Sequence, residues 1–164
     1  MDRSSAPPLR RGALTTAGPA ETRDVGRRLG AAAIPGTVLA LVGPLGAGKT
    51  ELAKGVAEGL GVAGIVNSPT FVLMNEHVGR LRLWHVDAYR LAEPEDVIAA
   101  GLLDERQVEG VTVIEWADRL GAWLPSERID LELAACDDPM ARELSWVAHG
   151  EAHERLAGGA LTAP

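Results

Sequence analysis

Apolar and polar residues recur along this chain with spacings that predict both helices and strands. Apolar residues repeat at helical spacing over residues 19–33 and again over residues 49–60, where Gly61 ends the repeat. Between these two segments, residues 37–42 form a short apolar run with β-branched side chains, which is typical of a buried strand. The pattern therefore predicts a strand, a glycine-rich loop and a helix in succession.

The second half of the chain predicts mainly strands. Residues 70–77 and 81–86 are strand-like and are separated by a turn at Gly79, which indicates a β-hairpin. Residues 111–114 are a short apolar run that we expect to be a central strand.

Two further segments complete the pattern. Residues 93–103 open with Glu-Pro-Glu-Asp, and acidic residues with an early proline suit the N-terminus of a helix. Residues 128–134 alternate between apolar and polar, as half-exposed strands do, and residues 143–148 are expected to pair with them in a second hairpin.

Composition narrows the class of protein. The 164 residues are 46% hydrophobic and 24% charged, as in globular proteins. No apolar run approaches the roughly 18 residues of a membrane helix, and no apolar run follows the N-terminal arginines, so we expect neither membrane association nor a secretory signal. Cys136 is the only cysteine, which excludes an intramolecular disulfide and predicts a cytoplasmic, reducing location.

Charge argues against direct nucleic-acid binding. The net charge is −7, whereas a nucleic-acid surface is normally basic. Acidic residues concentrate between residues 93 and 119, where eight acids face two bases. Two interpretations of this segment stay open: a solvated helical face, or a docking surface for a basic protein partner.

The glycine-rich loop, GPLGAGKT at residues 43–50, matches the phosphate-binding P-loop pattern in full. Glycines let the backbone wrap a phosphate with its N–H groups pointing inward, at the N-terminus of the following helix. In this pattern the lysine ammonium contacts the β- and γ-phosphates and the threonine hydroxyl binds Mg²⁺. The predicted nucleotide-binding residues are Gly43, Leu45, Gly46, Ala47, Gly48, Lys49, Thr50 and Glu51.

Lysine usage supports this interpretation over a chance glycine turn. The chain has only two lysines, Lys49 and Lys54, against fourteen arginines, and one of the two stands at the position that needs a slim ammonium group. The Asn-Lys-x-Asp element typical of guanine recognition is absent from the sequence. The predicted ligands are therefore ATP and Mg²⁺.

These observations predict an α/β fold: a single-domain P-loop NTPase, built as a three-layer sandwich with a mixed parallel and antiparallel sheet. We expect the domain to span residues 13–149. Residues 1–12 are rich in proline, serine and arginine and predict a disordered tail, and residues 150–164, rich in alanine and glycine, predict a mobile tail.

Two acidic residues follow predicted strands, where the ligand crevice of an open α/β sheet lies. Asp87 follows residues 81–86, and Glu115 follows residues 111–114. Either is a candidate for the acid on the Mg²⁺ side, or an ordinary surface carboxylate. Thr70 follows Ser68-Pro69 and is placed to reach Mg²⁺ or the γ-phosphate, although the segment also fits a plain turn that enters a strand.

The aromatic neighbours of these acids are less informative. His85 lies within an apolar run, and we expect it to be a packed core residue. Trp116 fits either a core position or one beside the nucleotide, and the pattern does not separate the two.

Together these segments resemble the TsaE (YjeE) family, the ATPases of bacterial tRNA threonylcarbamoyladenosine synthesis. The resemblance covers about residues 15–148 and departs from the family pattern at Ala117 and Asp118, where Pro then Glu is frequent. The matching segments are Glu21-Thr22 with Leu29-Gly30, the loop at 43–50, SPTF at 68–71, HVDAYRL at 85–91 and IEW at 114–116.

The resemblance implies roles that spacing and composition do not show. Glu115 would orient or activate the attacking water and, with Lys49, form the catalytic pair. Thr70 would sense the γ-phosphate, and Thr22 would lie near the nucleotide. The metal-side residues would be Thr50, Asp87, Thr70 and Glu115.

The resemblance also implies partners. They would be the proteins TsaD and TsaB, whose complex transfers a threonylcarbamoyl group to adenosine 37 of tRNA. This chain would bind the TsaB–TsaD complex and reset it between turnovers through ATP hydrolysis that is slow in the isolated protein. It would meet tRNA only indirectly, through the complex, which agrees with its acidic charge.

Two other functions stay open. A small-molecule kinase would need an acceptor pocket and a lid with paired arginines, and the sequence shows no such segment. A nucleotide-controlled binding module would bind ATP with negligible turnover. The variant Glu115→Gln separates the ATPase from the binding module, because only an ATPase loses activity through that change.

Overall fold

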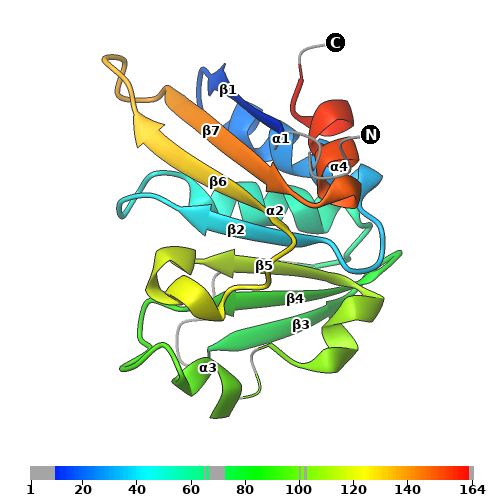
Figure 1. The fold of residues 1–164 in the computed structure, drawn as a ribbon. Coiled ribbons are helices and arrows are strands. Elements are labelled where there is room, and N and C mark those ends of the chain that lie inside the picture. The colour runs from blue at the N-terminus through cyan, green and yellow to red at the C-terminus, as the bar shows by residue number, and fades with distance from the viewer. Residues whose placement is uncertain (1–9, 65, 67–72, 100, 102, 163–164) are drawn as a thin grey trace, which may run out of the picture.

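A mixed sheet forms the centre of the structure (Figure 1). The computed structural model describes residues 10–64, 66, 73–99, 101 and 103–162. The strands are β1 (Arg10–Thr16), β2 (Val38–Val42), β3 (Met74–Val78), β4 (Arg82–Asp87), β5 (Val111–Glu115), β6 (Arg128–Ala135) and β7 (Arg142–His149).

The strands lie in the order β1-β7-β6-β2-β5-β4-β3. The four in the middle, β6, β2, β5 and β4, run parallel to one another. Antiparallel strands flank them, with β7 and β1 beyond β6 and with β3 beyond β4. The α/β class and the mixed sheet expected from the sequence are confirmed, as are both predicted hairpins and the central position of β5.

Helices cover the two faces of the sheet unequally. On one face, α1 (Pro19–Ala32), α2 (Lys49–Gly59) and α4 (Glu151–Ala160) pack together with the sheet in one apolar cluster. On the other face the apolar cluster involves β2, β4 and β5, and the described residues that cover it come from short elements and loops. The short elements of the fold are α3 (Asp96–Ala99) and the 3-10 helices η1 (Glu105–Glu109), η2 (Ala117–Arg119) and η3 (Gly121–Trp123), of which α3 and η2 contribute Val97 and Ala117 to this cluster.

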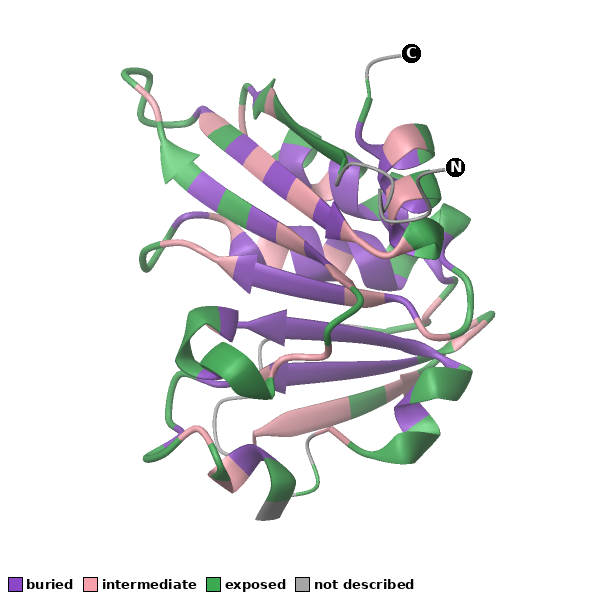
Figure 2. Ribbon diagram, in the orientation of Figure 1, coloured by how far each residue is buried: buried purple, intermediate pink, exposed green. Residues whose placement is uncertain are grey.

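The expected three-layer sandwich is therefore realised over only part of the sheet. Figure 2 shows the central strands β4 and β5 buried over most of their length, whereas buried and more exposed residues alternate along β6 and β7. In β6, for example, Ile129 and Leu131 are fully buried, whereas the alternate residues Asp130 and Glu132 are not. The outward side of β6 and β7 thus lacks a complete third layer.

The helix predicted for residues 93–103 is shorter in the structure. Its described part is Asp96–Ala99, preceded by turns. Gly101 has a φ of 69°, a left-handed conformation that glycine adopts readily at the end of a helix, and its N–H donates to the Ile98 carbonyl. The acidic opening of the segment was informative about the start of a helix and not about its length.

Both predicted tails include residues that belong to regular elements in the structure. Residues 10–12 were assigned to a disordered tail but belong to β1, where Arg10, Arg11 and Gly12 pair with β7. Residues 150–164 were assigned to a mobile tail, but α4 occupies most of them and buries His153, Leu156, Ala157 and Ala160 at helical spacing. The alanine- and glycine-rich composition masked this apolar face. Residues 1–9, 163 and 164 lie outside the described residues.

No helix in the described part of the chain is long and apolar enough to cross a membrane.

Helices α1 and α2 touch backbone to backbone through paired glycines. Gly26 and Gly30 of α1 face Gly55 and Gly59 of α2. A Cβ atom on Gly55 would lie 2.0 Å from the Arg23 carbonyl oxygen, where no carbon atom fits. This close packing fixes the position of α2, whose N-terminus receives the glycine-rich loop.

Replacing Gly55 by alanine is expected to lower the free energy of unfolding by about 3 kcal/mol or more, because two backbones must move apart. The matched control is Gly159→Ala in α4, where an added Cβ meets no atom within 4 Å. That change is expected to be neutral or to raise the free energy of unfolding by up to about 1 kcal/mol, through helix propensity. Urea unfolding of both variants measures the difference, and equal effects would contradict the glycine packing.

A buried histidine joins α4 to the start of β2. The His153 Nε2 accepts a hydrogen bond from the Val38 N–H at 3.0 Å, and its buried Nδ1 has no hydrogen-bond partner among the described residues. Burial lowers the pKa of His153, and nearby Glu127 partly opposes this. The pKa of His77 is also lowered, first by burial and then by His85.

These lowered pKa values predict a loss of stability in mild acid. A histidine whose folded pKa is below its unfolded value of 6.5 stabilises the fold above that pH, and the contribution is lost as pH falls because only the unfolded chain gains the proton. We expect the free energy of unfolding to fall from about pH 7 to about pH 5, by at most about 1.4 kcal/mol per pH unit for each histidine. Urea titrations of the wild type and His153→Gln measure it; the same slope in both would contradict the assignment to His153.

Candidate functional site

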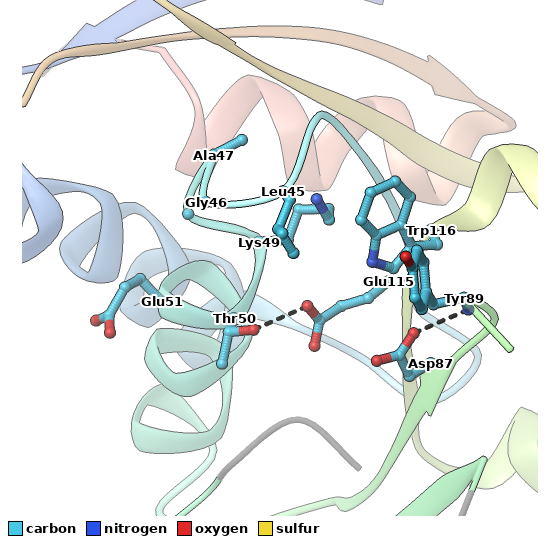
Figure 3. A pocket seen from close by; sticks show the side chains of 11 residues that line it. Leu45, Gly46, Ala47, Lys49, Thr50, Glu51, Asp87, Tyr89, Glu115 and Trp116 are labelled. Carbon is cyan, nitrogen blue, oxygen red and sulfur yellow. Dashed lines mark hydrogen bonds between the residues drawn. The ribbon is translucent and has the colours of Figure 1, made fainter. Parts of the chain in front are cut away.

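The carboxyl ends of three parallel strands meet at one edge of the sheet. In the strand register, Glu115 at the end of β5 pairs with Leu41 of β2 on one side and with Asp87 of β4 on the other. The loop that follows β2 and the two acids therefore face one crevice. A pocket of about 410 Å³ opens there (Figure 3), lined by Leu45, Gly46, Ala47, Gly48, Lys49, Thr50, Glu51, Asp87, Tyr89, Glu115 and Trp116.

Glycine is required at three points of the loop between β2 and α2. Gly43, Gly46 and Gly48 have φ values of 153°, 79° and 102°, which residues with a Cβ rarely adopt. The helix α2 begins directly after Gly48, so the free N–H groups of its first turn lie at the pocket. A helix N-terminus of this kind attracts anions, phosphates in particular.

Lys49 supplies a buried positive charge to the pocket. The residue is 5% exposed, and its Nζ donates to the carbonyls of Gly43 at 2.6 Å and Pro44 at 2.9 Å. Burial lowers the pKa of Lys49, and the carboxylates of Glu115, Asp118 and Asp87 oppose this shift. The ammonium group is thus anchored in place by its own loop.

Glu115 is buried and held from two sides. It is 3% exposed, and its Oε1 accepts a hydrogen bond from the Thr50 hydroxyl at 2.9 Å. Its Oε2 lies 2.5 Å from the Nε2 of His85, which is itself 1% exposed. Two contacts from different elements therefore fix the orientation of this carboxylate (Figure 3 draws the contact with Thr50).

Asp87 and two aromatic rings complete the wall of the pocket. The Oδ1 of Asp87 accepts a hydrogen bond from the Tyr89 backbone N–H at 2.9 Å. The ring centroids of Tyr89 and Trp116 are 4.9 Å apart, and the Lys49 Nζ lies 4.0 Å from the Trp116 centroid. This favours a cation–π contact that holds Lys49 against the wall.

Trp116 has an unusual backbone conformation. Its φ of 58° makes it the only non-glycine residue with positive φ in the described part of the chain. Such a conformation costs about 1–3 kcal/mol and is typical of functional sites. Here it turns the chain directly after Glu115, so that the indole lies in the pocket wall. The sequence pattern does not separate a core from a pocket position for Trp116; in the structure Trp116 lines the pocket and also packs against the apolar cluster of β2, β4 and β5.

Most predicted site residues come together in this pocket. Leu45, Gly46, Ala47, Gly48, Lys49, Thr50, Glu51, Asp87 and Glu115 all line it, and Gly43 begins the loop. Glu51 also forms an ion pair with Arg23 of α1 at 2.6 Å. Thr70 lies outside the described residues.

Thr22 lies beside the glycine-rich loop, and its place near the nucleotide stays a prediction. Its side chain is buried, with the residue 1% exposed, and its Oγ1 lies 2.8 Å from the Oγ1 of Thr16. A Cβ added to Gly48 would lie 3.6 Å from the Thr22 methyl group. Thr22 therefore packs beneath the loop and is not among the residues that line the pocket.

Sequence reasoning missed the role of His85. The residue is buried, as expected for a core position, but its ring contacts Glu115. The two-residue spacing from Asp87 was the available signal, because it places both side chains on the same face of β4. In the register of β4 and β5, Glu115 pairs with Asp87 and is the diagonal neighbour of His85, and the sequence alone did not supply this register.

The oxygen donors in the pocket suit a magnesium ion that arrives with a nucleotide. No group of three His, Cys, Asp or Glu residues among the described residues is arranged to hold a metal by itself. Thr50, Asp87 and Glu115 offer one hydroxyl and two carboxylates. Mg²⁺ typically takes one or two protein carboxylates and completes its shell with phosphates and water.

Comparison with known proteins gives a consistent result. The family model of the threonylcarbamoyl adenosine biosynthesis protein TsaE matches residues 16–144. The tRNA threonylcarbamoyladenosine biosynthesis protein TsaE of Bacillus subtilis is 43% identical over 143 residues, which is 86% of this chain and 88% of that protein. Its namesake from Mycobacterium leprae is 38% identical over 147 residues, 84% of this chain and 91% of that protein. The crystal structure of Bacillus subtilis YdiB superimposes with a TM-score of 0.74 at 36% identity, covering 93% of this chain and 95% of that one.

Proposed function

Because this chain belongs to the TsaE family of tRNA threonylcarbamoyladenosine biosynthesis proteins, we propose that it is a Mg²⁺-dependent ATPase with a P-loop NTPase core. In this proposal the chain binds the TsaB–TsaD complex in the cytoplasm and resets it between turnovers by hydrolysing ATP. It thereby supports threonylcarbamoyl transfer to adenosine 37 of tRNA without performing the transfer itself.

One observation carries the ATPase proposal: a cation, a hydroxyl and two carboxylates from separate elements converge on one pocket at the N-terminus of α2. Lys49 and Thr50 come from α2, Asp87 ends β4 and Glu115 ends β5. Hydrolysis of ATP requires positive charge and backbone N–H groups to bind the phosphates and oxygen ligands to bind the metal. It also requires a hydrogen-bond acceptor that positions the attacking water.

Each residue then has a task. The loop of residues 43–50 binds the phosphates, and Lys49 neutralises the charge on the β- and γ-phosphates. Thr50 and Asp87 hold Mg²⁺, which supplies charge neutralisation when it is bound. Glu115 accepts a hydrogen bond from a water molecule and takes its proton as the water oxygen attacks the γ-phosphorus, while the bond from that phosphorus to the β–γ bridging oxygen breaks and ADP leaves.

The pocket also supports slow turnover by the protein alone. None of the described residues that line it is an arginine, the group that commonly stabilises the charge developing during transfer. Stimulation by the TsaB–TsaD complex is the expected consequence, whether the partner supplies such a group or orders the pocket.

A reconstituted modification reaction tests the resetting role. The TsaB–TsaD complex, threonylcarbamoyl donor and tRNA are mixed with this chain, with or without ATP, and modified adenosine is counted per complex. We expect about one product per complex without this chain and many with the chain and ATP. Repeated turnover without the chain, or no gain on adding it, would contradict the proposal.

A further inference from the structure

Arg142, the first residue of β7, ties the hairpin between β6 and β7 to the glycine-rich loop. Its Nε donates to the Ala47 carbonyl at 3.2 Å, and its Nη2 donates to the Gly46 carbonyl at 3.1 Å. Its Nη1 donates to the carbonyls of Pro139 at 2.8 Å and Ala141 at 2.7 Å. One guanidinium group therefore joins two neighbouring carbonyls of the loop to two carbonyls of the hairpin.

These bonds set the direction of two peptide planes. In a trans peptide, the carbonyl of one residue and the N–H of the next point in opposite directions, and the described peptide bonds are all trans. When the Ala47 carbonyl points at Arg142, the Gly48 N–H must point away from Arg142. The Gly46 carbonyl fixes the Ala47 N–H in the same way, and that N–H donates to the Pro44 carbonyl at 3.1 Å.

The loop needs such a restraint because glycines flank these planes. Gly46 and Gly48 have positive φ values, and glycine passes between backbone conformations more readily than any other residue. Within the loop, the bond from the Ala47 N–H to the Pro44 carbonyl holds one of these planes, and Arg142 adds a restraint on both. A planar guanidinium with donors in a fixed fork can hold two consecutive carbonyls at once, which a lysine ammonium cannot do with the same geometry.

We propose that Arg142 is a positioning residue for the nucleotide: it holds the peptide planes of residues 46–48 in the orientation that binds phosphate, without touching the phosphate itself. This inference rests on the proposed binding of ATP. Part of the nucleotide-binding site would then lie in the hairpin of β6 and β7, outside the P-loop motif of residues 43–50.

Arg128 provides a matched control. It is the first residue of β6, as Arg142 is of β7, and it too is a partly buried arginine that donates to a backbone carbonyl, that of Pro125, at 2.8 Å. Its Nε donates to Asp130 at 2.7 Å. The strands β6 and β2 are parallel, and Arg128 is at the start of β6, whereas the loop follows the end of β2. Arg128 therefore lies at the opposite ends of the strands from the loop.

The test compares the full-length wild type with Arg142→Met, Arg142→Lys and Arg128→Met. Equilibrium binding of Mg·ATP and Mg·ADP is measured by calorimetry, and kcat and KM are measured by phosphate release. We expect both Arg142 variants to bind Mg·ATP and Mg·ADP about tenfold more weakly, with KM raised alongside and kcat within about threefold of the wild type. Arg128→Met should bind both nucleotides as the wild type does. This holds even if Arg128→Met and Arg142→Met lower the melting temperature by the same amount.

The outcomes separate this inference from the proposed function. Absence of nucleotide binding by the wild type would overturn the ATPase proposal and the inference with it. Binding by the wild type together with unchanged affinity in the Arg142 variants would overturn the inference alone, as would an equal loss of affinity in Arg128→Met. Arg142→Lys keeps the charge and the apolar stem, so it remains a folded test if Arg142→Met does not fold.

Discussion

Replacing Glu115 by glutamine is expected to remove ATP hydrolysis and to leave ATP binding in place. Glutamine has nearly the same shape, and its amide oxygen can still accept the hydrogen bond that the Thr50 hydroxyl now donates to Oε1. It lacks the negative charge and the proton affinity needed to hold or activate water. The loss of a general base typically costs about 10²- to 10⁴-fold in rate, which single-turnover phosphate release measures.

The environment of Glu115 makes this substitution informative. The side chain is buried, and with the amide oxygen on Thr50 the new NH2 group can donate to the Nε2 of His85 in the tautomer that carries its proton on Nδ1, so the fold should tolerate the change. Glu109→Gln is the matched control, because Glu109 is an exposed glutamate just before the other end of β5. Phosphate release by Glu115→Gln at the rate of Glu109→Gln would remove Glu115 from catalysis and favour the binding-module alternative.

Replacing Lys49 by alanine is expected to weaken ATP binding itself. The ammonium is the one cationic side chain among the described residues that line the pocket, and it is held rigidly by the Gly43 and Pro44 carbonyls. A hydrogen bond to a charged group is worth about 1.5–3 kcal/mol, so the dissociation constant of Mg·ATP should rise by roughly ten- to a hundredfold. Calorimetric titration of Mg·ATP into both proteins measures the change.

Lys54→Ala controls for the loss of a lysine from α2. Lys54 is on the same helix, one turn further on, and its Nζ lies 3.6 Å from a carboxylate oxygen of Glu51. We expect its removal to leave ATP affinity within about twofold, since surface ion pairs contribute little. An unchanged affinity in Lys49→Ala would refute the assignment of the loop as a phosphate site.

The sequence predicted the loop and its flanking elements because their causes are local. A short apolar run makes β2 a buried strand, the glycines permit the positive φ values, and Lys49 begins a helix whose apolar residues repeat at helical spacing. The strand ends at Asp87 and Glu115 could also be recognised from the local pattern. The rule that ligands bind beyond the carboxyl ends of parallel strands then predicted that the two residues lie together, as they do.

Contacts between distant segments could not be read from the chain in the same way. The contact of His85 with Glu115 depends on the pairing of β4 with β5, and the hold of Arg142 on the loop depends on β6 lying beside β2. The packing of Thr22 beneath Gly48 likewise depends on the close approach of α1 to α2 through glycines. Small residues give little pattern in a hydropathy plot, although they decide how near two helices can come.

The ends of the domain were missed for a different physical reason. β1 is an edge strand that is exposed along most of its length, so it lacks the apolar alternation that marks a half-buried strand. In α4 the buried face includes two alanines and a histidine beside one leucine, and four alanines and glycines near its end resemble a flexible segment. Burial in these places comes from neighbouring elements and not from strongly apolar residues.

The most direct test of the account is steady-state phosphate release from Mg·ATP by this chain, alone and with the TsaB–TsaD complex, with Lys49→Ala as the blank. We predict a slow rate for the chain alone that rises when the complex is added and vanishes in the variant. A rate that does not respond to the complex would contradict partner-coupled hydrolysis, and it would direct attention to phosphate acceptors and the kinase alternative. A rate that persists in Lys49→Ala would contradict the pocket itself as the site of hydrolysis.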